Sequence, residues 1–328
     1  MKAIVCHQYG SPDVLRLEEV QKPIPKDDEA LIKVHAASVN SFDWGLLKGK
    51  PFLNRLIVSG LFKPRYKILG CDIAGRVEGI GRNVKQLQPG DEVFGDLSAC
   101  GFGAFAEYAC APENALVLKS ASMTFEEAAA IPQAGLLALQ GLRDKGQIQS
   151  GHKVLINGAS GGVGTYAVQI AKSFGAEVTA VCSTRKMDMV RSIGADHVID
   201  YTKEDFTKSG KHYDLILDVA AYHSIFDCKR SLSPEGIYVC IGGSMNQYFQ
   251  AMLLGPLISR MGSKKMCAVF APPTHEDYLF LIELFEAGKL VPVIDRHYPL
   301  NEVAEALRYY GEGNARGKVV ITVEHYSS

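Results

Sequence analysis

The first third of the chain alternates apolar and polar positions with the period of β-strands. Residues 30–36 read Ala-Leu-Ile-Lys-Val-His-Ala, and a glycine-rich strand over residues 70–81 suits bulges and tight corners. A Pro-Gly-Asp turn at residues 89–91 separates this strand from the next. Short strands with regular turns predict a barrel-like antiparallel domain over residues 1–121.

The pattern changes near residue 122. Thr124 and Glu127 form a capping-box motif that opens an Ala- and Leu-rich helical stretch, with a kink or break expected at Pro132. Apolar strands then alternate with amphipathic helices, beginning with the strand at residues 153–157. Such βαβ repetition predicts a doubly wound parallel sheet over residues 122–265, hence an α/β protein.

The last part of the chain, residues 266–328, contains two predicted helices and a closing strand. It is too short for a core of its own, so we expect it to pack on the first domain. The most apolar segment, residues 251–261, is too short to cross a membrane and is interrupted by Gly255, Pro256 and Arg260. We interpret it as a buried or interface helix, with contact to a membrane surface as the less favoured alternative.

Charge and cysteine content narrow the class of protein. The 35 Lys and Arg residues nearly balance 36 Asp and Glu residues, so no basic surplus indicates nucleic-acid binding. The first residues lack the apolar core of a secretory signal. Eight scattered cysteines without a Cys-x-x-Cys pair are typical of reduced thiols, so we expect a cytoplasmic protein.

A glycine-rich loop at residues 157–164 joins the first apolar strand of the parallel sheet to its helix. Ala159, Gly161 and Gly164 fall in the three glycine positions of the dinucleotide fingerprint. The helix end offers unpaired N–H groups and a positive dipole to a pyrophosphate. The residues predicted to contact it are Ala159, Ser160, Gly161, Gly162, Val163 and Gly164.

The end of the second strand of this sheet indicates which dinucleotide binds. An NAD site usually ends that strand with an acid, but here Ser183, Arg185 and Lys186 follow it, and the first acid is Asp188. A hydroxyl and two cations suit the 2′-phosphate of NADPH. We therefore expect NADPH as the cofactor.

Motifs along most of the chain support a family resemblance. They are the run Gly70-x-Asp72-x-x-Gly75-x-Val77-x-x-x-Gly81, Asn40-Ser41-Phe42-Asp43-Trp44, the glycine-rich loop, residues 194–201 (Gly-Ala-Asp-His-Val-Ile-Asp-Tyr) and Gly317-Lys318-Val319-Val320. The chain resembles the medium-chain dehydrogenase/reductase superfamily, and within it the zinc-free quinone oxidoreductases and alkenal or enone reductases. The resemblance implies a GroES-like catalytic domain, a Rossmann domain, a cofactor in the cleft between them, and a homodimer.

The resemblance also assigns cofactor contacts. It implies that Ser41 lies against the nicotinamide, Tyr201 near the adenosine, Val219 near the nicotinamide ribose and Phe270 near the carboxamide.

Zinc ligands of the related alcohol dehydrogenases are missing from this chain. Asn40, Cys71-Asp72 and Ala134 stand in the ligand positions, and only Cys100 and Cys110 stand where a structural zinc needs four cysteines. We predict no metal. Without a Lewis acid, alcohol oxidation is disfavoured.

The resemblance implies hydride transfer from NADPH to a small quinone or α,β-unsaturated carbonyl compound. Asn40 and Asp43 are our candidate catalytic residues, and the alternative is a turn asparagine and a buried carboxylate that hold the loop. Tyr66 and Tyr108 are candidate proton donors, because Gly45 replaces the tyrosine that several relatives carry.

Three other functions remain open at this point. They are an enoyl-thioester reductase, an NADPH-binding structural or redox-sensing protein without turnover, and a zinc alcohol dehydrogenase with unusual ligands. The apolar, basic-edged residues 51–67 either border a substrate entrance or form an ordinary connection.

Overall fold

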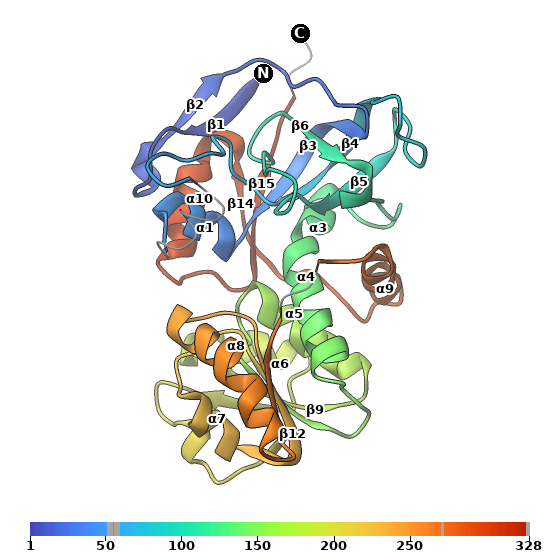
Figure 1. Cartoon of the computed structure of the whole chain (residues 1–328). Helices are drawn as coiled ribbons and strands as arrows, with labels where there is room; N and C mark the ends of the chain where they lie inside the picture. Colours follow the sequence, from blue (N-terminus) through green and yellow to red (C-terminus); the bar gives the residue numbers. More distant parts are fainter. Residues whose placement is uncertain (51–54, 56–59, 270–271, 326–328) are drawn as a thin grey trace. The chain divides into compact units, whose positions relative to one another are not determined.

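The computed structural model of the chain describes residues 1–50, 55, 60–269 and 272–325 (Figure 1). It divides into two compact units: unit 1 comprises Met1–Gln133 and Ile294–Ser328, and unit 2 comprises Ala134–Val293. These bounds differ from the expected divisions at 121 and 265. The helix at Phe125–Ala130 packs on the strands of unit 1, and the helix at His275–Glu286 belongs to unit 2.

Unit 1 is built on a mainly antiparallel sheet of short strands. The bounds are β1 (Lys2–Cys6), β2 (Leu15–Glu19), β3 (Glu29–Val39), β4 (Asp72–Ile80), β5 (Glu92–Asp96), β6 (Tyr108–Pro112), β7 (Leu116–Leu118), β14 (Ile294–Pro299) and β15 (Lys318–Thr322). The order is β14-β15-β3-β4-β5-β7, β6 pairs with the first half of β3, and β1 pairs with β2. The antiparallel strands predicted for this part of the chain are confirmed.

The long strand β3 organises unit 1, because it pairs with β15, β4 and β6 at once. Register shifts at Leu31/Ile32 and Val34/Ala36 bend it, as β-bulges do. Helices α1 (Ser41–Lys48), α3 (Phe125–Ala130) and α10 (Val303–Gly311) belong to this unit. Apolar side chains of α1 and α10 complete one core with the strands, and α3 packs on β3 and β4.

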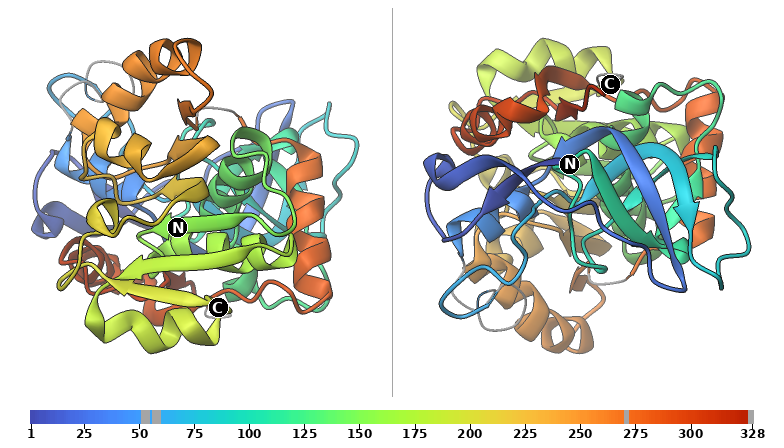
Figure 2. Two further views of the ribbon diagram at one scale, coloured as in Figure 1. Left: turned by 90° about the horizontal axis from the view of Figure 1, so that it is seen from below. Right: turned by 90° about the horizontal axis from the view of Figure 1, so that it is seen from above.

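Unit 2 is a doubly wound parallel sheet. Its strands are β8 (Lys153–Asn157), β9 (Glu177–Cys182), β10 (His197–Asp200), β11 (Tyr213–Asp218), β12 (Leu232–Cys240) and β13 (Lys265–Ala268), and its helices are α5 (Gly162–Ser173), α6 (Met187–Ser192), α7 (Ile225–Arg230), α8 (Met245–Arg260) and α9 (His275–Glu286). The strand order β10-β9-β8-β11-β12-β13 is that of a Rossmann sheet. Helices lie on both faces of the sheet, α8 on one of them (Figure 2).

Two local predictions can be compared with the structure directly. The predicted capping box is present: Glu127 N–H donates to Thr124 Oγ1 at 3.1 Å, and Thr124 N–H donates to Glu127 Oε2 at 2.9 Å. The helix ends at Ala130, and Pro132 opens the next one, α4 (Pro132–Leu139), which a π-helical turn at Gln140–Lys145 extends. The break expected at Pro132 is therefore confirmed.

The apolar segment at residues 251–261 lies in α8, a longer helix than the sequence indicated. The helix runs from Met245 to Arg260, includes Pro256 and buries Ala251, Gly255 and Ile258, so the helix expected here is present. Among the described residues, no helix is both long and apolar enough to span a membrane.

Candidate functional site

The glycine-rich loop lies at the carboxyl end of β8. The N–H groups of Gly158 and Ala159 both donate to the carbonyl of Val181, each at 3.1 Å, and so hold the loop against the end of β9. Helix α5 then begins with Gly161 as N-cap, and no side chain caps it. Its first N–H groups are therefore left for another acceptor, at the positive end of the helix dipole.

Two glycines of this loop differ in what surrounds them. A Cβ on Gly164 would lie 2.1 Å from Gly158 O and 2.6 Å from Ala159 Cα, both backbone atoms. A Cβ on Gly161 would meet only Gly158 O, at an ordinary 3.6 Å. Gly164 thus permits the close contact between helix and turn, whereas the side of Gly161 is open.

The cationic segment after β9 forms a short turn. Ser183 precedes a 3₁₀ turn at Thr184–Lys186 without capping it through its side chain, and α6 begins only at Met187. The side chain of Arg185 is exposed and has no hydrogen bond or ion pair with any residue that the structure describes. Ser183 and Lys186 are half-buried. A free guanidinium beside a hydroxyl and an ammonium suits an anion.

Asp200, a carboxylate that the sequence interpretation missed, ends the neighbouring strand β10. It accepts hydrogen bonds from the hydroxyls of Thr184 and Thr202, and Lys203 Nζ lies 3.5 Å away. The hydrogen bond from Thr184, followed by that from Thr202, lowers its pKa to about 2. Tyr201 follows it with an exposed ring, and its N–H donates to the carbonyl of Cys182 at 3.1 Å.

A buried polar network joins the ends of β8, β11 and β12. Asp218 accepts from Asn157 Nδ2 at 2.8 Å and from the Tyr238 hydroxyl at 2.9 Å. Burial raises the pKa of Asp218 to about 6 and raises that of Tyr238. Val219 follows directly, half-buried, with its N–H bonded to the carbonyl of Asn157. In the sequence, this network was indicated by Asp218, an acid at the end of the largely apolar strand β11.

In unit 1, Asn40 belongs to a second buried polar network. Its Nδ2 donates to Asp72 Oδ2 at 2.9 Å, and its Oδ1 accepts from Lys318 Nζ at 2.6 Å. Lys318 Nζ also lies 3.1 Å from Asp72 Oδ2, which accepts the Ser38 hydroxyl at 2.7 Å. Asp72 and Lys318 are fully enclosed, so this is a buried ion pair. In the sequence, this ion pair was indicated by Lys318, a lysine at the start of the apolar strand β15.

Asp43 is wholly buried at the start of α1. Its carboxylate accepts the N–H groups of Asn40 at 2.9 Å and Gly70 at 3.1 Å, and the thiol of Cys71 at 3.3 Å. Gly70 has a φ of +101°, and a Cβ there would lie 2.7 Å from the Phe105 nitrogen, so this turn requires glycine. Burial raises the pKa of Asp43 to about 7, against the hydrogen bond from Asn40.

A third carboxylate, Asp96, pairs in register with Asp72 across β4 and β5. Burial, followed by the charge of Asp72, raises the pKa of Asp96 to about 6. Burial thus favours the protonated form of both Asp43 and Asp96. Asp43 itself has no exposed surface. These contacts fix the first turn of α1, where Ser41 is exposed.

The two candidate tyrosines occupy different places in unit 1. Tyr66 packs edge-on against Phe102 with ring centroids 4.9 Å apart, and Phe102 packs against Phe42 of α1 at 5.6 Å. Tyr108 lies under the ammonium of Lys22, 3.7 Å from its ring centroid. Of the two, only Tyr66 is linked to the helix that carries Ser41.

The predicted site residues thus fall into two sets. Residues 159–164, Ser183, Arg185, Lys186, Tyr201 and Val219 follow the carboxyl ends of β8, β9, β10 and β11 in unit 2, while Asn40, Ser41 and Asp43 stand together in unit 1. Phe270 lies outside the described residues. Within the described ranges, no group of three His, Cys, Asp or Glu side chains is arranged to hold a metal ion.

Comparison with known proteins identifies the class. Residues 26–121 match the alcohol dehydrogenase GroES-like domain family, and residues 193–321 match the zinc-binding dehydrogenase family. The chain is similar to the chloroplast envelope quinone oxidoreductase homolog of Arabidopsis thaliana, with 34% identity over 98% of both sequences. It is also 34% identical to the chloroplastic NADPH-dependent alkenal/one oxidoreductase of the same plant, over 98% of this chain and 79% of that protein.

A solved structure agrees with these relatives. The quinone oxidoreductase from Coxiella burnetii superposes with a TM-score of 0.89 at 30% identity and covers 99% of both chains. The chain belongs to the medium-chain dehydrogenase/reductase superfamily and, within it, to the quinone oxidoreductase branch. The family resemblance and the GroES-like plus Rossmann fold predicted from sequence are confirmed.

Proposed function

We propose that this protein is an NADPH-dependent, zinc-independent reductase that transfers hydride to quinones or α,β-unsaturated carbonyl compounds. The observation that carries the proposal is the uncapped start of α5 at Gly161, together with the unpaired Arg185. Relatives described as quinone and alkenal/one oxidoreductases support the substrate class.

The residues of unit 2 fit a dinucleotide. The N–H groups of residues 162–164 would hold the pyrophosphate, since α5 has no side-chain cap and Gly161, whose own N–H donates to the carbonyl of Gly158, leaves room beside it. Ser183, Arg185 and Lys186 would hold a 2′-phosphate, with Tyr201 at the adenosine and Val219 at the nicotinamide ribose. The carboxylate of Asp200 is already engaged by two threonine hydroxyls, so it is a poor acceptor for a ribose hydroxyl.

In unit 1 we assign Asn40 and Asp43 a positioning role. The nicotinamide supplies the hydride when bound, and reduction of an enone places negative charge on the carbonyl oxygen, which hydrogen-bond donors stabilise. All polar atoms of the Asp43 carboxylate are used within the protein, and Asn40 is held by Asp72 and Lys318. Both residues fix the start of α1 and thereby present Ser41.

A substrate panel followed at 340 nm tests the proposal. We expect turnover of NADPH with free enones, alkenals or quinones, little turnover with enoyl-coenzyme A, and no change after treatment with a metal chelator. Stoichiometric zinc in elemental analysis would contradict the metal-free mechanism. Tight binding of NADPH without its consumption by any compound would favour a binding protein without turnover.

Arg185→Ala tests the choice of cofactor. Loss of charge-assisted hydrogen bonds to the 2′-phosphate should weaken NADPH binding about 10- to 100-fold and change NADH binding less than about twofold. Calorimetric titration with both dinucleotides measures the two affinities. Arg191→Ala is the matched control, because this nearby arginine is paired with Asp188 at 3.0 Å. Equal losses for NADPH and NADH would refute the phosphate assignment.

A further inference from the structure

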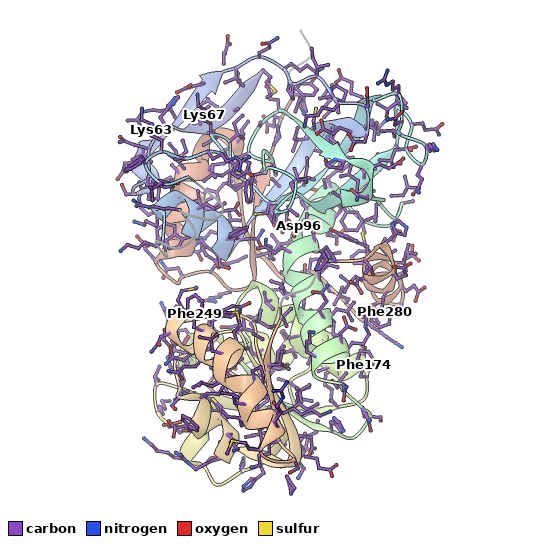
Figure 3. The ribbon with its side chains drawn as sticks, in the orientation of Figure 1. Lys63, Lys67, Asp96, Phe174, Phe249 and Phe280 are labelled. Atoms are coloured by element: carbon purple, nitrogen blue, oxygen red, sulfur yellow. The ribbon has the colours of Figure 1, made fainter. Side chains whose placement is uncertain are left out.

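Tyr310 lies in the last turn of α10, where this helix packs on α1. A Cβ on Gly311 would lie 2.3 Å from Trp44 Cη2 on α1, so the close approach of the two helices depends on glycine. The helices lie side by side in unit 1 (Figure 1), and side chains fill the space between them (Figure 3). The residue before Gly311 is therefore held close to the start of α1.

Ser41 is the partner of Tyr310 on α1. Ser41 and Trp44 are three residues apart, so both lie on the face of α1 that meets α10. Burial raises the pKa of the Tyr310 phenol to about 12, and the hydrogen bond with Ser41 opposes this rise. The two hydroxyls are thus within hydrogen-bonding reach, and the phenol is protonated at neutral pH.

The two residues of this pair differ in exposure. Ser41 is exposed at the first position of α1, whereas Tyr310 is half-buried and packs on the core of unit 1. The turn that carries Ser41 is fixed by the hydrogen bond from the Asn40 N–H to Asp43, at 2.9 Å. A compound in solution can therefore reach Ser41, with a protonated phenol behind it.

The neighbouring Tyr309 is used in a different way. Its hydroxyl donates to Asp295 Oδ2 at 2.8 Å, and the guanidinium of Arg296 lies 4.2 Å from its ring centroid. Tyr309 therefore ties α10 to the start of β14 rather than to α1. Two adjacent tyrosines of one helix thus have separate partners, and only the hydroxyl of Tyr310 reaches Ser41.

We propose that Ser41 and Tyr310 form a proton relay, in which Ser41 protonates the carbonyl oxygen of the substrate and Tyr310 replaces that proton. The inference rests on the proposed function. Hydride transfer forms a C–H bond on the substrate, and the displaced π-electron pair comes to the carbonyl oxygen. The proton of Ser41 forms the new O–H bond, the phenol reprotonates Ser41, and the phenolate takes a proton from water, so one proton is consumed per turnover. Tyr310 acts through Ser41 and is therefore a positioning residue.

Steady-state kinetics of hydroxyl-deletion variants test the relay, with NADPH and the enone or quinone that the full chain reduces fastest. Tyr310→Phe keeps the ring and should lower kcat at least about tenfold, with KM changed less than about twofold. Ser41→Ala should lose as much, and Y310F/S41A should be no worse than Ser41→Ala alone, because both hydroxyls act in series. Ser41→Thr restores a hydroxyl and should regain most of the rate.

A matched variant and a second measurement separate the relay from a structural role. Tyr309→Phe removes the adjacent hydroxyl, which is bonded to Asp295, and should keep the unaltered kcat. In nuclear magnetic resonance of the protein without dinucleotide, labelled at the tyrosine Cζ atoms, the signal that disappears in Tyr310→Phe belongs to Tyr310. Ser41→Ala should shift this signal, whereas Ser192→Ala, which changes an exposed serine of unit 2, should not.

The possible failures can be told apart. If the full chain reduces an enone or quinone and Tyr310→Phe does so at the same rate, the relay is refuted while the proposed function stands. A Tyr310 signal that does not respond to Ser41→Ala, or a loss in Tyr310→Phe that Tyr309→Phe matches, also overturns the relay. If the full chain reduces none of these compounds, the proposed function fails and the relay fails with it.

Discussion

Replacing Asp72 by alanine is expected to destabilise unit 1 by about 3–5 kcal/mol, the usual cost of removing one partner of a buried ion pair. The carboxylate accepts hydrogen bonds from Ser38, Asn40, Lys318 and the Gln133 N–H, and the side chains of Ser38, Asn40 and Lys318 are buried. The ammonium of Lys318 would remain buried without its ion-pair partner, although it would keep the hydrogen bond to Asn40. Loss of the network should also release the start of α1, and with it Ser41.

Urea unfolding followed by tryptophan fluorescence measures this effect. Trp44 is the single tryptophan of the chain and lies on α1, so its emission reports on unit 1. Arg76→Met is the matched control on the same strand: its ion pair with Glu92 is largely exposed and should contribute less than about 1 kcal/mol.

A double-mutant cycle separates the ion pair from simple packing. The variant D72N/K318M removes both charges, so it should be more stable than the sum of its single variants predicts, by about 1–3 kcal/mol. Strictly additive effects would show that the two side chains do not act as a pair.

Gly164→Ala should disrupt unit 2 and dinucleotide binding together. The new methyl group would overlap the backbone of Gly158 and Ala159, so α5 must move away from the loop, at a cost of about 1–3 kcal/mol or more. The displaced N–H groups should lower dinucleotide affinity at least about tenfold. Circular dichroism melting and calorimetric titration with NADPH measure the two losses.

Gly161→Ala is the companion that separates folding from binding. Its methyl group finds ordinary contact distances, so the stability should change by no more than about 1 kcal/mol, the cost of an alanine N-cap. Affinity for NADPH should nevertheless fall about tenfold, because the methyl group occupies the open side that a pyrophosphate needs. Unchanged affinity in this variant would place the phosphates elsewhere.

The sequence by itself determined the elements and the order in which they assemble. Apolar residues at every second position predicted β3 and β4, and the alternation of strands and helices after residue 150 predicted the parallel sheet. Both predictions were possible because strands and helices repeat with different periods, which appear in the spacing of apolar residues along the chain. Thr124 with Glu127 predicted a helix start that the structure contains, since capping depends on residues only three apart. The glycine-rich turn at residues 158–164 and the cations after β9 were likewise readable, because both are local features of the sequence.

Other features were decided only by the tertiary structure. The partners Asn40 and Lys318 are 278 residues apart in the sequence. No local sequence pattern predicts that β15 brings the ammonium of Lys318 to both Asn40 and Asp72. The same holds for Asp200, whose bond to Thr184 depends on the register of β10 against β9. In α8, the sequence showed an apolar segment, but which of its side chains face outward depends on how the helix packs on β13. Period and turn chemistry are local properties of the chain, whereas the pairing of buried charges and the exposure of a helix face arise from contacts between distant segments.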